Sequence, residues 1–313
     1  KNGNIELKVL KGLNLEVKEG EYVAFMGPSG SGKSTLMNIL GCLDSLTSGI
    51  YILDGQDVST IKGDALAEVR NKKIGFVFQT FNLLPKMTAV ENVALPALYA
   101  GVKKAERIKR ATEALESVGL GERIHHKPNE MSGGQRQRVA LARSLVINPR
   151  LILLDEPFSN LDKNLRNIMR NEIKKLVKYF KMTTILVTHD QEDAFIMADK
   201  VILMNEGKII QNSTVTELYN FPNSEFSLSF IGNSNKFDKE NFIRPEKIKI
   251  VDYETDIPAN IFEKQFRGAF IEYQLKLKGN DEEILKVIEL NTGKEKNIGD
   301  DVFIEYKVQK LSN

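Results

Sequence analysis

The chain has 313 residues, of which 42% are hydrophobic and 27% are charged, and its 44 basic side chains nearly balance its 42 acidic ones. This composition is typical of a globular protein with more than one domain, and its charge balance argues against a nucleic-acid binder. No stretch approaches about 18 uninterrupted apolar residues and no export signal is evident, so we expect a cytoplasmic protein.

From Ile5 to about Ile231, short β-rich runs alternate with helical patterns, which predicts a mostly parallel sheet flanked by helices. The clearest expected strands span residues 22–26, 74–78, 151–154, 184–188 and 201–204. Between about residues 83 and 148, amphipathic helices replace the strand signal. We therefore expect one α/β domain over residues 1–232, with a helical subdomain at about 83–148.

The first expected strand is followed by the spacing of a phosphate-binding P-loop and then by a helix over residues 34–40. Its glycines let backbone N–H groups face phosphate oxygens, and the helix N-terminus adds positive potential. Lys33 is expected to reach the β- and γ-phosphates of ATP, and Ser34 to ligate Mg²⁺. The residues predicted to bind nucleotide here are Gly27, Pro28, Ser29, Gly30, Ser31, Gly32, Lys33, Ser34 and Thr35.

A second apolar strand, residues 151–154, ends in Asp155 and Glu156. An aspartate at the carboxyl end of a strand beside a P-loop can hold Mg²⁺, and the next carboxylate can polarise a water molecule for attack on the γ-phosphorus. A strand ending in two acidic residues is weak evidence alone, because many strands end in acidic turns. The pair is a candidate for the nucleotide site because it follows a P-loop in the sequence.

The segment Ser132-Gly133-Gly134-Gln135 is a second potential anion cradle. Ser132 favours an N-cap, the two glycines permit close backbone approach, and an apolar-periodic helix follows. One chain thus carries two phosphate-binding devices for one expected nucleotide. This predicts a head-to-tail dimer in which each ATP lies between one subunit's P-loop and the other's cradle. The alternative interpretation is an ordinary capped helix.

In this order, the motifs of residues 5–232 resemble the nucleotide-binding domain of ABC transporters. Gln79, Asp162 and His189 add three further matches to the family's glutamine loop, subunit-contact loop and switch histidine. The resemblance implies an α/β P-loop ATPase in which Gln79 senses Mg²⁺ and the transmembrane partner, and His189 contacts the γ-phosphate. It assigns Glu156, His189 and Gln79 as catalytic residues, Asp162 to the nucleotide site, and Ser34, Gln79 and Asp155 as Mg²⁺ ligands.

One family element has no counterpart in the sequence. The aromatic side chain that stacks on adenine is expected near or before the first residues, and Lys1-Asn2-Gly3-Asn4 supplies none. We therefore expect it upstream of Lys1.

After residues 233–235 the pattern changes to five β-rich segments, near 247–253, 257–266, 269–278, 284–290 and 302–311. Five short strands predict a small barrel over residues 235–313, with the OB type as the first hypothesis. Many such barrels bind nucleic acid. However, residues 235–313 contain 14 Lys and Arg against 16 Asp and Glu. A phosphate-tracking groove needs the opposite sign of charge, so we expect no nucleic-acid partner.

The branch of the family is less clear, because two sets of segments differ in what they resemble. Residues 41–44, 71–85 and 126–129 are similar to ATPases of the lipoprotein-release and macrolide-efflux type. Residues 155–159, 230–232 and 244–246 resemble importer ATPases for sugars, polyamines or iron, which carry a TOBE-type barrel after the motor. Efflux-type ATPases usually end near residue 230, so the additional barrel favours import.

For an importer, the resemblance implies transmembrane permease subunits, a homodimer or a heterodimer with a related ATPase, and an extracytoplasmic substrate-binding protein. The expected location is the cytoplasmic face of the cell membrane. A soluble ABC-type ATPase acting on DNA or ribosomes is a rival hypothesis, but the short span from Lys33 to Ser132 has no room for a long coiled coil, and a second motor domain is missing. A catalytically inactive scaffold is disfavoured because Lys33, Asp155, Glu156 and His189 are all present.

Overall fold

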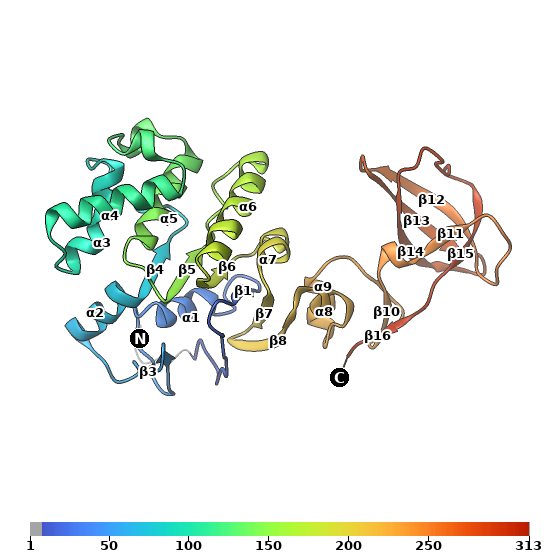
Figure 1. The fold of residues 1–313 in the computed structure, drawn as a ribbon. Coiled ribbons are helices and arrows are strands. Elements are labelled where there is room, and N and C mark those ends of the chain that lie inside the picture. The colour runs from blue at the N-terminus through green and yellow to red at the C-terminus, as the bar shows by residue number, and fades with distance from the viewer. Residues whose placement is uncertain (1–7, 313) are drawn as a thin grey trace. The chain divides into compact units, whose positions relative to one another are not determined.

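The computed structural model describes residues 8–312, without the side chains of residues 280–282 (Figure 1). The chain divides into two compact units, Lys1–Val215 and Thr216–Asn313. The expected start of the α/β pattern at Ile5, and the first four residues considered for adenine stacking, lie outside the described residues.

The N-terminal unit is built on a six-stranded sheet with the order β4-β5-β6-β1-β7-β8. All neighbours are parallel except β7 and β8, which are antiparallel. Strands β1 and β5 are almost entirely buried, as expected of a parallel sheet covered on both faces. The strands are β1 (Tyr22–Met26), β4 (Ile74–Val77), β5 (Leu151–Asp155), β6 (Thr183–Val187), β7 (Lys200–Asn205) and β8 (Lys208–Thr214).

The five strands expected in this region are therefore confirmed, and β8 is an addition. Its residues are mostly half-buried or exposed, so no strong apolar run marks it in the sequence. A small hairpin, β2 (Ile52–Leu53) with β3 (Gln56–Asp57), lies outside this sheet. The helices that accompany the sheet are α1 (Lys33–Leu40), α2 (Gly63–Lys73), α6 (Lys163–Tyr179) and α7 (Gln191–Met197).

The segment between β4 and β5 is helical, as predicted. It contains α3 (Ala89–Tyr99), α4 (Lys104–Ser117) and α5 (Gly133–Leu145), which Figure 1 shows grouped together, and two short 3-10 turns at Gly121–Arg123 and Pro128–Glu130. Thr88 begins α3 with a capping box: its side chain accepts a hydrogen bond from Glu91 N, and Glu91 Oε2 accepts one from Thr88 N at 2.8 Å. Helices α3 and α4 both pack against α5, which in turn packs on β4.

The C-terminal unit is mainly β-structure, as predicted. One antiparallel sheet has the order β11-β15-β12-β13-β14, and a smaller sheet has the order β16-β10-β9. The large sheet consists of β11 (Lys249–Val251), β12 (Pro258–Phe266), β13 (Phe270–Leu277), β14 (Asn280–Leu290) and β15 (Asp301–Glu305). The small sheet consists of β9 (Asn235–Lys236), β10 (Asn241–Ile243) and β16 (Gln309–Lys310).

The six strands β11 to β16 correspond to the five predicted β-rich segments, because the last predicted segment is divided into β15 and β16. The apolar core includes Ile261, Tyr273, Leu275 and Val287, which lie on the buried face of β12, β13 and β14. Strands β12, β13 and β14 form a meander of consecutive antiparallel neighbours. The assignment of this sheet to an OB or TOBE barrel stays a prediction.

The compact units divide before the domain limit expected from the motifs. Helices α8 (Val215–Asn220) and α9 (Glu225–Phe230) group with the β-rich unit, apart from Val215 itself. Arg244 explains this grouping, because its fully buried guanidinium donates hydrogen bonds to Tyr219 O and Asn233 O at 3.0 Å and stacks on the Tyr219 ring at 4.3 Å. The limits 1–232 and 235–313, which follow motif content, stay a prediction.

Among residues 8–312, no helix combines the length and the apolar character needed to cross a membrane.

Candidate nucleotide site

Four predicted site segments lie at one edge of the N-terminal sheet. The parallel strands β4, β5, β6 and β1 are consecutive neighbours, and each is followed by one of these segments (Figure 1). Gln79 follows β4, Glu156 follows β5, His189 follows β6, and the P-loop, Gly27–Thr35, follows β1. Because the carboxyl ends of parallel strands meet at one edge, segments scattered over the sequence converge there.

The P-loop needs glycine where its backbone is most unusual. Gly27 has φ 148°, and a Cβ at this position would lie 2.2 Å from Met204 O. Gly32, which precedes α1, has φ 100°, and its Cβ would lie 2.8 Å from Leu10 Cδ2. L-residues rarely adopt these conformations, so both positions favour glycine through strain and close contact.

The side chain of Lys33 folds back against the first residues of the P-loop. Its side chain is buried, and Nζ donates hydrogen bonds to Gly27 O at 2.8 Å and to Pro28 O at 2.9 Å. Burial lowers the pKa of Lys33, while the charges of Glu156 and Asp155 act in the opposite direction. The ammonium group thus binds the loop carbonyls, and the two carboxylates at the end of β5 favour its charged form.

Asp155 and Glu156 differ in their surroundings. Burial raises the pKa of Asp155, the charge of Glu156 adds to this effect, and the charge of Lys33 opposes it. Glu156 has φ 43°, and its backbone is held by the hydrogen bond that its N donates to Val187 O at 2.9 Å and by Ser159 Oγ, which donates to Glu156 O at 2.9 Å. Positive φ is unusual for glutamate and is often found at functional positions.

His189 lies beside Glu156. A 2.9 Å hydrogen bond joins His189 Nδ1 to Glu156 Oε1, and the imidazole is largely exposed. The residues that flank His189 are fixed from α6 and α7. Asp190 pairs with Arg166 at 2.9 Å, and Thr188 Oγ donates to Asp193, which pairs with the fully buried Arg170. An anchored loop thus presents an accessible ring.

Gln79 and Asp162 lie on two loops that also meet. Asn160 Nδ2 donates a hydrogen bond to Gln79 O at 2.9 Å, which leaves the Gln79 side chain exposed. Asp162 begins α6 as its N-cap, and its carboxylate accepts a hydrogen bond from Leu165 N at 2.9 Å. The predicted contact of Asp162 with a second subunit stays a prediction.

The Ser132 cradle, Ser132–Gln135, forms a capping box at the start of α5. Ser132 Oγ accepts a hydrogen bond from Gln135 N at 3.3 Å, and Gln135 Oε1 accepts one from Ser132 N at 2.9 Å. Within residues 8–312, no hydrogen bond or ion pair links this cradle to the P-loop. The structure therefore brings together the segments after the four strands, and the Ser132 cradle lies near the Asp162 loop but has no such link to the P-loop.

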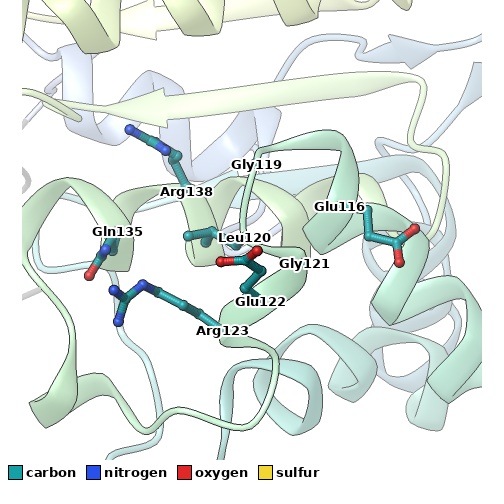
Figure 2. Close-up of a pocket in the computed structure, with 8 residues that line it drawn as sticks. All are labelled: Glu116, Gly119, Leu120, Gly121, Glu122, Arg123, Gln135 and Arg138. Carbon is teal, nitrogen blue, oxygen red and sulfur yellow. The ribbon is translucent and has the colours of Figure 1, made fainter.

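A pocket of about 310 Å³ lies beside the cradle (Figure 2). Gln135 and Arg138 of α5 line it together with residues 116 and 119–123, which include two glutamates and one further arginine. None of its lining residues belongs to the P-loop. Its charges balance, and we assign no ligand to it.

Comparisons with known proteins identify the family. A family model described as "ABC transporter" matches residues 10–159. The chain is 50% identical over 210 residues to an uncharacterised ABC transporter ATP-binding protein of Thermotoga maritima, a match that covers 66% of this chain and 88% of that protein. The chain belongs to the ABC transporter family.

Two further relatives point to different branches of the family. The spermidine/putrescine import ATP-binding protein PotA of Haemophilus ducreyi is 36% identical over 317 residues, which covers 88% of this chain and 84% of that protein. The macrolide export ATP-binding/permease protein MacB of Brucella melitensis is 48% identical over 219 residues, which covers 70% of this chain but only 33% of that protein. The direction of transport is therefore not decided by similarity.

A solved relative supports the fold and the activity. The dimeric structure of a post-hydrolysis state of the ATP-binding cassette MJ0796, bound to ADP and Pi, is 42% identical and covers 69% of this chain and 94% of its own, with a TM-score of 0.62. The chain thus has the ABC-type P-loop fold with a helical subdomain, and it is an ATPase. The expectation of an ATP-binding ABC enzyme is confirmed, while the role of each site residue stays a prediction.

The sequence-based analysis missed three polar residues that hold the site loops of this ABC ATPase: Asn160, Gln137 and Arg143. Asn160 fixes the loop of Gln79, as described above. Gln137 and Arg143 lie on α5 and donate hydrogen bonds to the backbone that follows Glu156 and Gln79. The only signal for Gln137 was a polar side chain within an apolar-periodic helix, and such a signal does not say which backbone it binds.

Proposed function

We propose that this chain is the ATP-hydrolysing subunit of an ABC importer, which dimerises around two ATP molecules on membrane permease partners at the cytoplasmic face of the membrane. The similarity to PotA supports import, because it covers 88% of the chain, a larger share than the N-terminal unit alone. The β-rich sheets of the C-terminal unit also agree with an importer ATPase that carries an additional barrel.

The arrangement of Lys33, Asp155, Glu156 and His189 at one sheet edge carries the hydrolytic part of this proposal. Lys33 and the P-loop amides bind the β- and γ-phosphates of the substrate. Glu156 polarises the attacking water, and its hydrogen bond with His189 orients the carboxylate. His189, which is exposed beside Glu156, contacts the γ-phosphate. Bringing water, base and phosphate together in one orientation is the main source of catalysis in such a site.

The donor set fits Mg²⁺. Ser34 is exposed in the first turn of α1, Asp155 is half-buried at the end of β5, and Gln79 is exposed, so a hydroxyl, a carboxylate and an amide oxygen are available. These are hard oxygen ligands, and Mg²⁺ in nucleotide sites is held by few protein groups together with phosphates. The ion would neutralise charge on the β- and γ-phosphates.

The Ser132 cradle takes part in trans. Its helix N-terminus suits an anion, yet within the described chain it has no link to the P-loop. A second chain supplies the missing half of each site in this proposal, and the dimeric structure of MJ0796 with ADP and Pi supports it. The family resemblance of the Asp162 loop supports a role for this loop at the same contact.

Efflux is the second candidate function, and the 48% identity to MacB of Brucella melitensis favours it. The two candidates differ in direction. Permeases that co-purify with this chain from native membranes can be reconstituted in vesicles, where ATP supplied on the motor side drives substrate toward that side in an importer and away from it in an exporter.

Glu156→Gln tests the hydrolytic assignment. We expect kcat to fall by about 10²–10⁴-fold, as for loss of a general base, while ATP binding is preserved. Size-exclusion chromatography with ATP should show a longer-lived dimer for this variant. Glu113→Gln, at an exposed position on α4, is the matched control and should keep wild-type activity. Hydrolysis within a few-fold of wild type in Glu156→Gln would show that the base is another residue.

A further inference from the structure

Gln137 links the helix of the Ser132 cradle to the loop of the proposed catalytic base. It lies in the second turn of α5 and is fully buried, which is unusual for a glutamine. Its Nε2 donates a hydrogen bond at 2.8 Å to Pro157 O, on the residue directly after Glu156. Its Oε1 is buried and accepts no hydrogen bond from the described residues. The single bond to the Glu156 loop is thus its one polar contact.

Arg143 makes an equivalent link to the loop of Gln79. From the last turn of α5, Nη2 donates to Phe81 O and Nη1 donates to Asn82 O, both at 2.7 Å. Phe81 and Asn82 both have positive φ, at 60° and 45°, so this turn is held in a conformation that non-glycine residues rarely adopt. A guanidinium with two parallel donors is well suited to fix two successive carbonyls.

Helix α5 connects these two contacts to the cradle as a rigid element. It has 13 residues and is therefore a rod of about 20 Å. Near its C-terminal end it is packed tightly on β4, because a Cβ on Gly75 would lie 2.8 Å from Ser144 O. The packing near Ser144 thus resists movement of α5 when its N-terminal end, the Ser132 cradle, is displaced. Such a displacement would change the positions of Gln137 and Arg143, which lie on the same helix.

We propose that α5 transmits the occupancy of its cradle to the catalytic loops of the same chain, through Gln137 to the Glu156 loop and through Arg143 to the Gln79 loop. The inference rests on the proposed function in one respect: it takes the Ser132 cradle as the site for the partner's ATP. Gln137 and Arg143 are then positioning residues, and each nucleotide bound at the cradle favours the hydrolysing geometry at the other site.

The first experiment replaces Gln137 by Met in the full chain. Met keeps the shape of the side chain and removes the Nε2 donor together with the unpartnered Oε1, so it should fold. We expect kcat for ATP to fall about tenfold with KM within twofold, since misplacing a reacting group by a fraction of an ångström has effects of this size. The Hill coefficient for ATP should be above 1 in wild type and move toward 1. Gln56→Met, at an exposed position of β3, is the matched control.

The second experiment replaces Arg143 by Lys, which keeps the charge but loses the fork that binds both carbonyls. The same separation of kcat from KM is expected, and Arg150→Lys, at an exposed position after α5, is its control. If Arg143→Lys does not fold, Gln137→Met alone decides. A purely structural role for these residues would lower the unfolding temperature and leave kcat per folded chain unchanged, which would overturn the inference. A wild-type Hill coefficient of 1 would also overturn it.

Hydrogen exchange separates this inference from the proposed function. Without nucleotide, Gln137→Met should accelerate exchange of the amides in residues 158–161, and Arg143→Lys those in residues 80–83, whereas the two controls should not. If the wild-type chain fails to hydrolyse ATP but these exchange changes occur, the proposed function is wrong and the link through α5 stands. Active wild type with unchanged exchange and unchanged kcat in both variants would reject the link alone.

Discussion

The P-loop and the Ser132 cradle are both glycine-containing segments at helix N-termini, yet they are built differently. The P-loop backbone adopts conformations at Gly27 and Gly32 that suit only glycine, and the Lys33 ammonium group donates hydrogen bonds to the loop carbonyls. The cradle is relaxed: Ser132 has ordinary extended dihedral angles, φ −65° and ψ 165°, and its side chain is used in a capping box. The unusual backbone of the P-loop thus indicates a phosphate site within one chain. The Ser132 capping box already explains the local structure of its segment, so a role in nucleotide binding depends on a second chain.

The largest effect should come from alanine at the most constrained glycine. Gly27→Ala places a Cβ against Met204 O and forces an alanine to φ 148°, so we expect loss of measurable ATP binding and a decrease of about 3 kcal/mol in the free energy of unfolding. The comparison variant is Gly133→Ala, whose Cβ meets only Leu161 Cδ2 at 3.4 Å. It should change stability by less than about 1 kcal/mol. Calorimetric titration measures ATP binding, and chemical denaturation measures the free energy of unfolding. An equal decrease in the free energy of unfolding in the two variants would show that the two segments do not differ in backbone constraint.

The next largest effect tests whether the Ser132 cradle of a second chain completes the nucleotide site. Ser132→Arg should bind ATP at its own P-loop but lose hydrolysis by about 10²-fold or more, because the side chain fills the space where the partner's γ-phosphate docks. Lys33→Ala should lose ATP affinity as well as hydrolysis. A mixture of the two variants contains heterodimers with one intact P-loop opposite one intact cradle, so ATPase activity should partly recover. Normal hydrolysis by Ser132→Arg as a monomer would reduce the cradle to a helix cap.

A smaller effect tests the cap itself. Ser132→Ala removes the side chain that caps α5, and the free energy of unfolding should fall by about 1 kcal/mol. Thr88→Ala removes the equivalent capping box of α3 and is the matched variant. Both should lose similar stability in urea denaturation, but only Ser132→Ala should also lower the ATPase rate. If both rates are unchanged, the Ser132 hydroxyl serves the helix and not the nucleotide.

The smallest expected effect is the change in unfolding temperature when Asp155, beside the P-loop, is replaced. Burial raises the pKa of Asp155 in the folded chain above its unfolded value, so the folded state favours the protonated form. Stability from this group is present below the unfolded pKa and is lost as the pH rises through the folded pKa. Asp155→Asn should therefore unfold at a slightly higher Tm than wild type at pH 7, and the difference should shrink as the pH is lowered toward 4. A constant difference would point to packing instead of charge.

These contrasts explain how far sequence alone could predict the structure. The P-loop could be located because the positions of Gly27, Gly30, Gly32 and Lys33 are dictated by local backbone geometry. Glu156 could be proposed because it follows an apolar strand after a P-loop, and His189 because it matches the family's switch histidine. The parallel sheet then brings Glu156 Oε1 and His189 Nδ1 within 2.9 Å. Strand order is a tertiary property, so the sequence predicted that these residues converge without giving that distance.

The features that were missed depend on long-range contacts to backbone atoms. Arg143 binds carbonyls about 60 positions earlier, and Asn160 binds Gln79 O, whose position depends on the order of the sheet. Any arginine or asparagine can bind a carbonyl, so residue type does not identify the partner. Strand β8 was missed for a related reason, because half-exposed residues give no strong apolar pattern.

The buried Arg244 has a practical consequence for dividing the protein. Its guanidinium donates hydrogen bonds to Tyr219 O, near the end of α8, and to Asn233 O, which follows α9, and within residues 8–312 no carboxylate accepts a hydrogen bond from it. A chain shortened after residue 232 would keep both helices but remove the arginine that stacks on the Tyr219 ring and binds the carbonyl of Tyr219. A chain ending at Val215 would leave these helices with the β-rich unit. For expression of the ATPase domain alone, the boundary between the compact units and the boundary inferred from the motifs thus give different end points, residues 215 and 232.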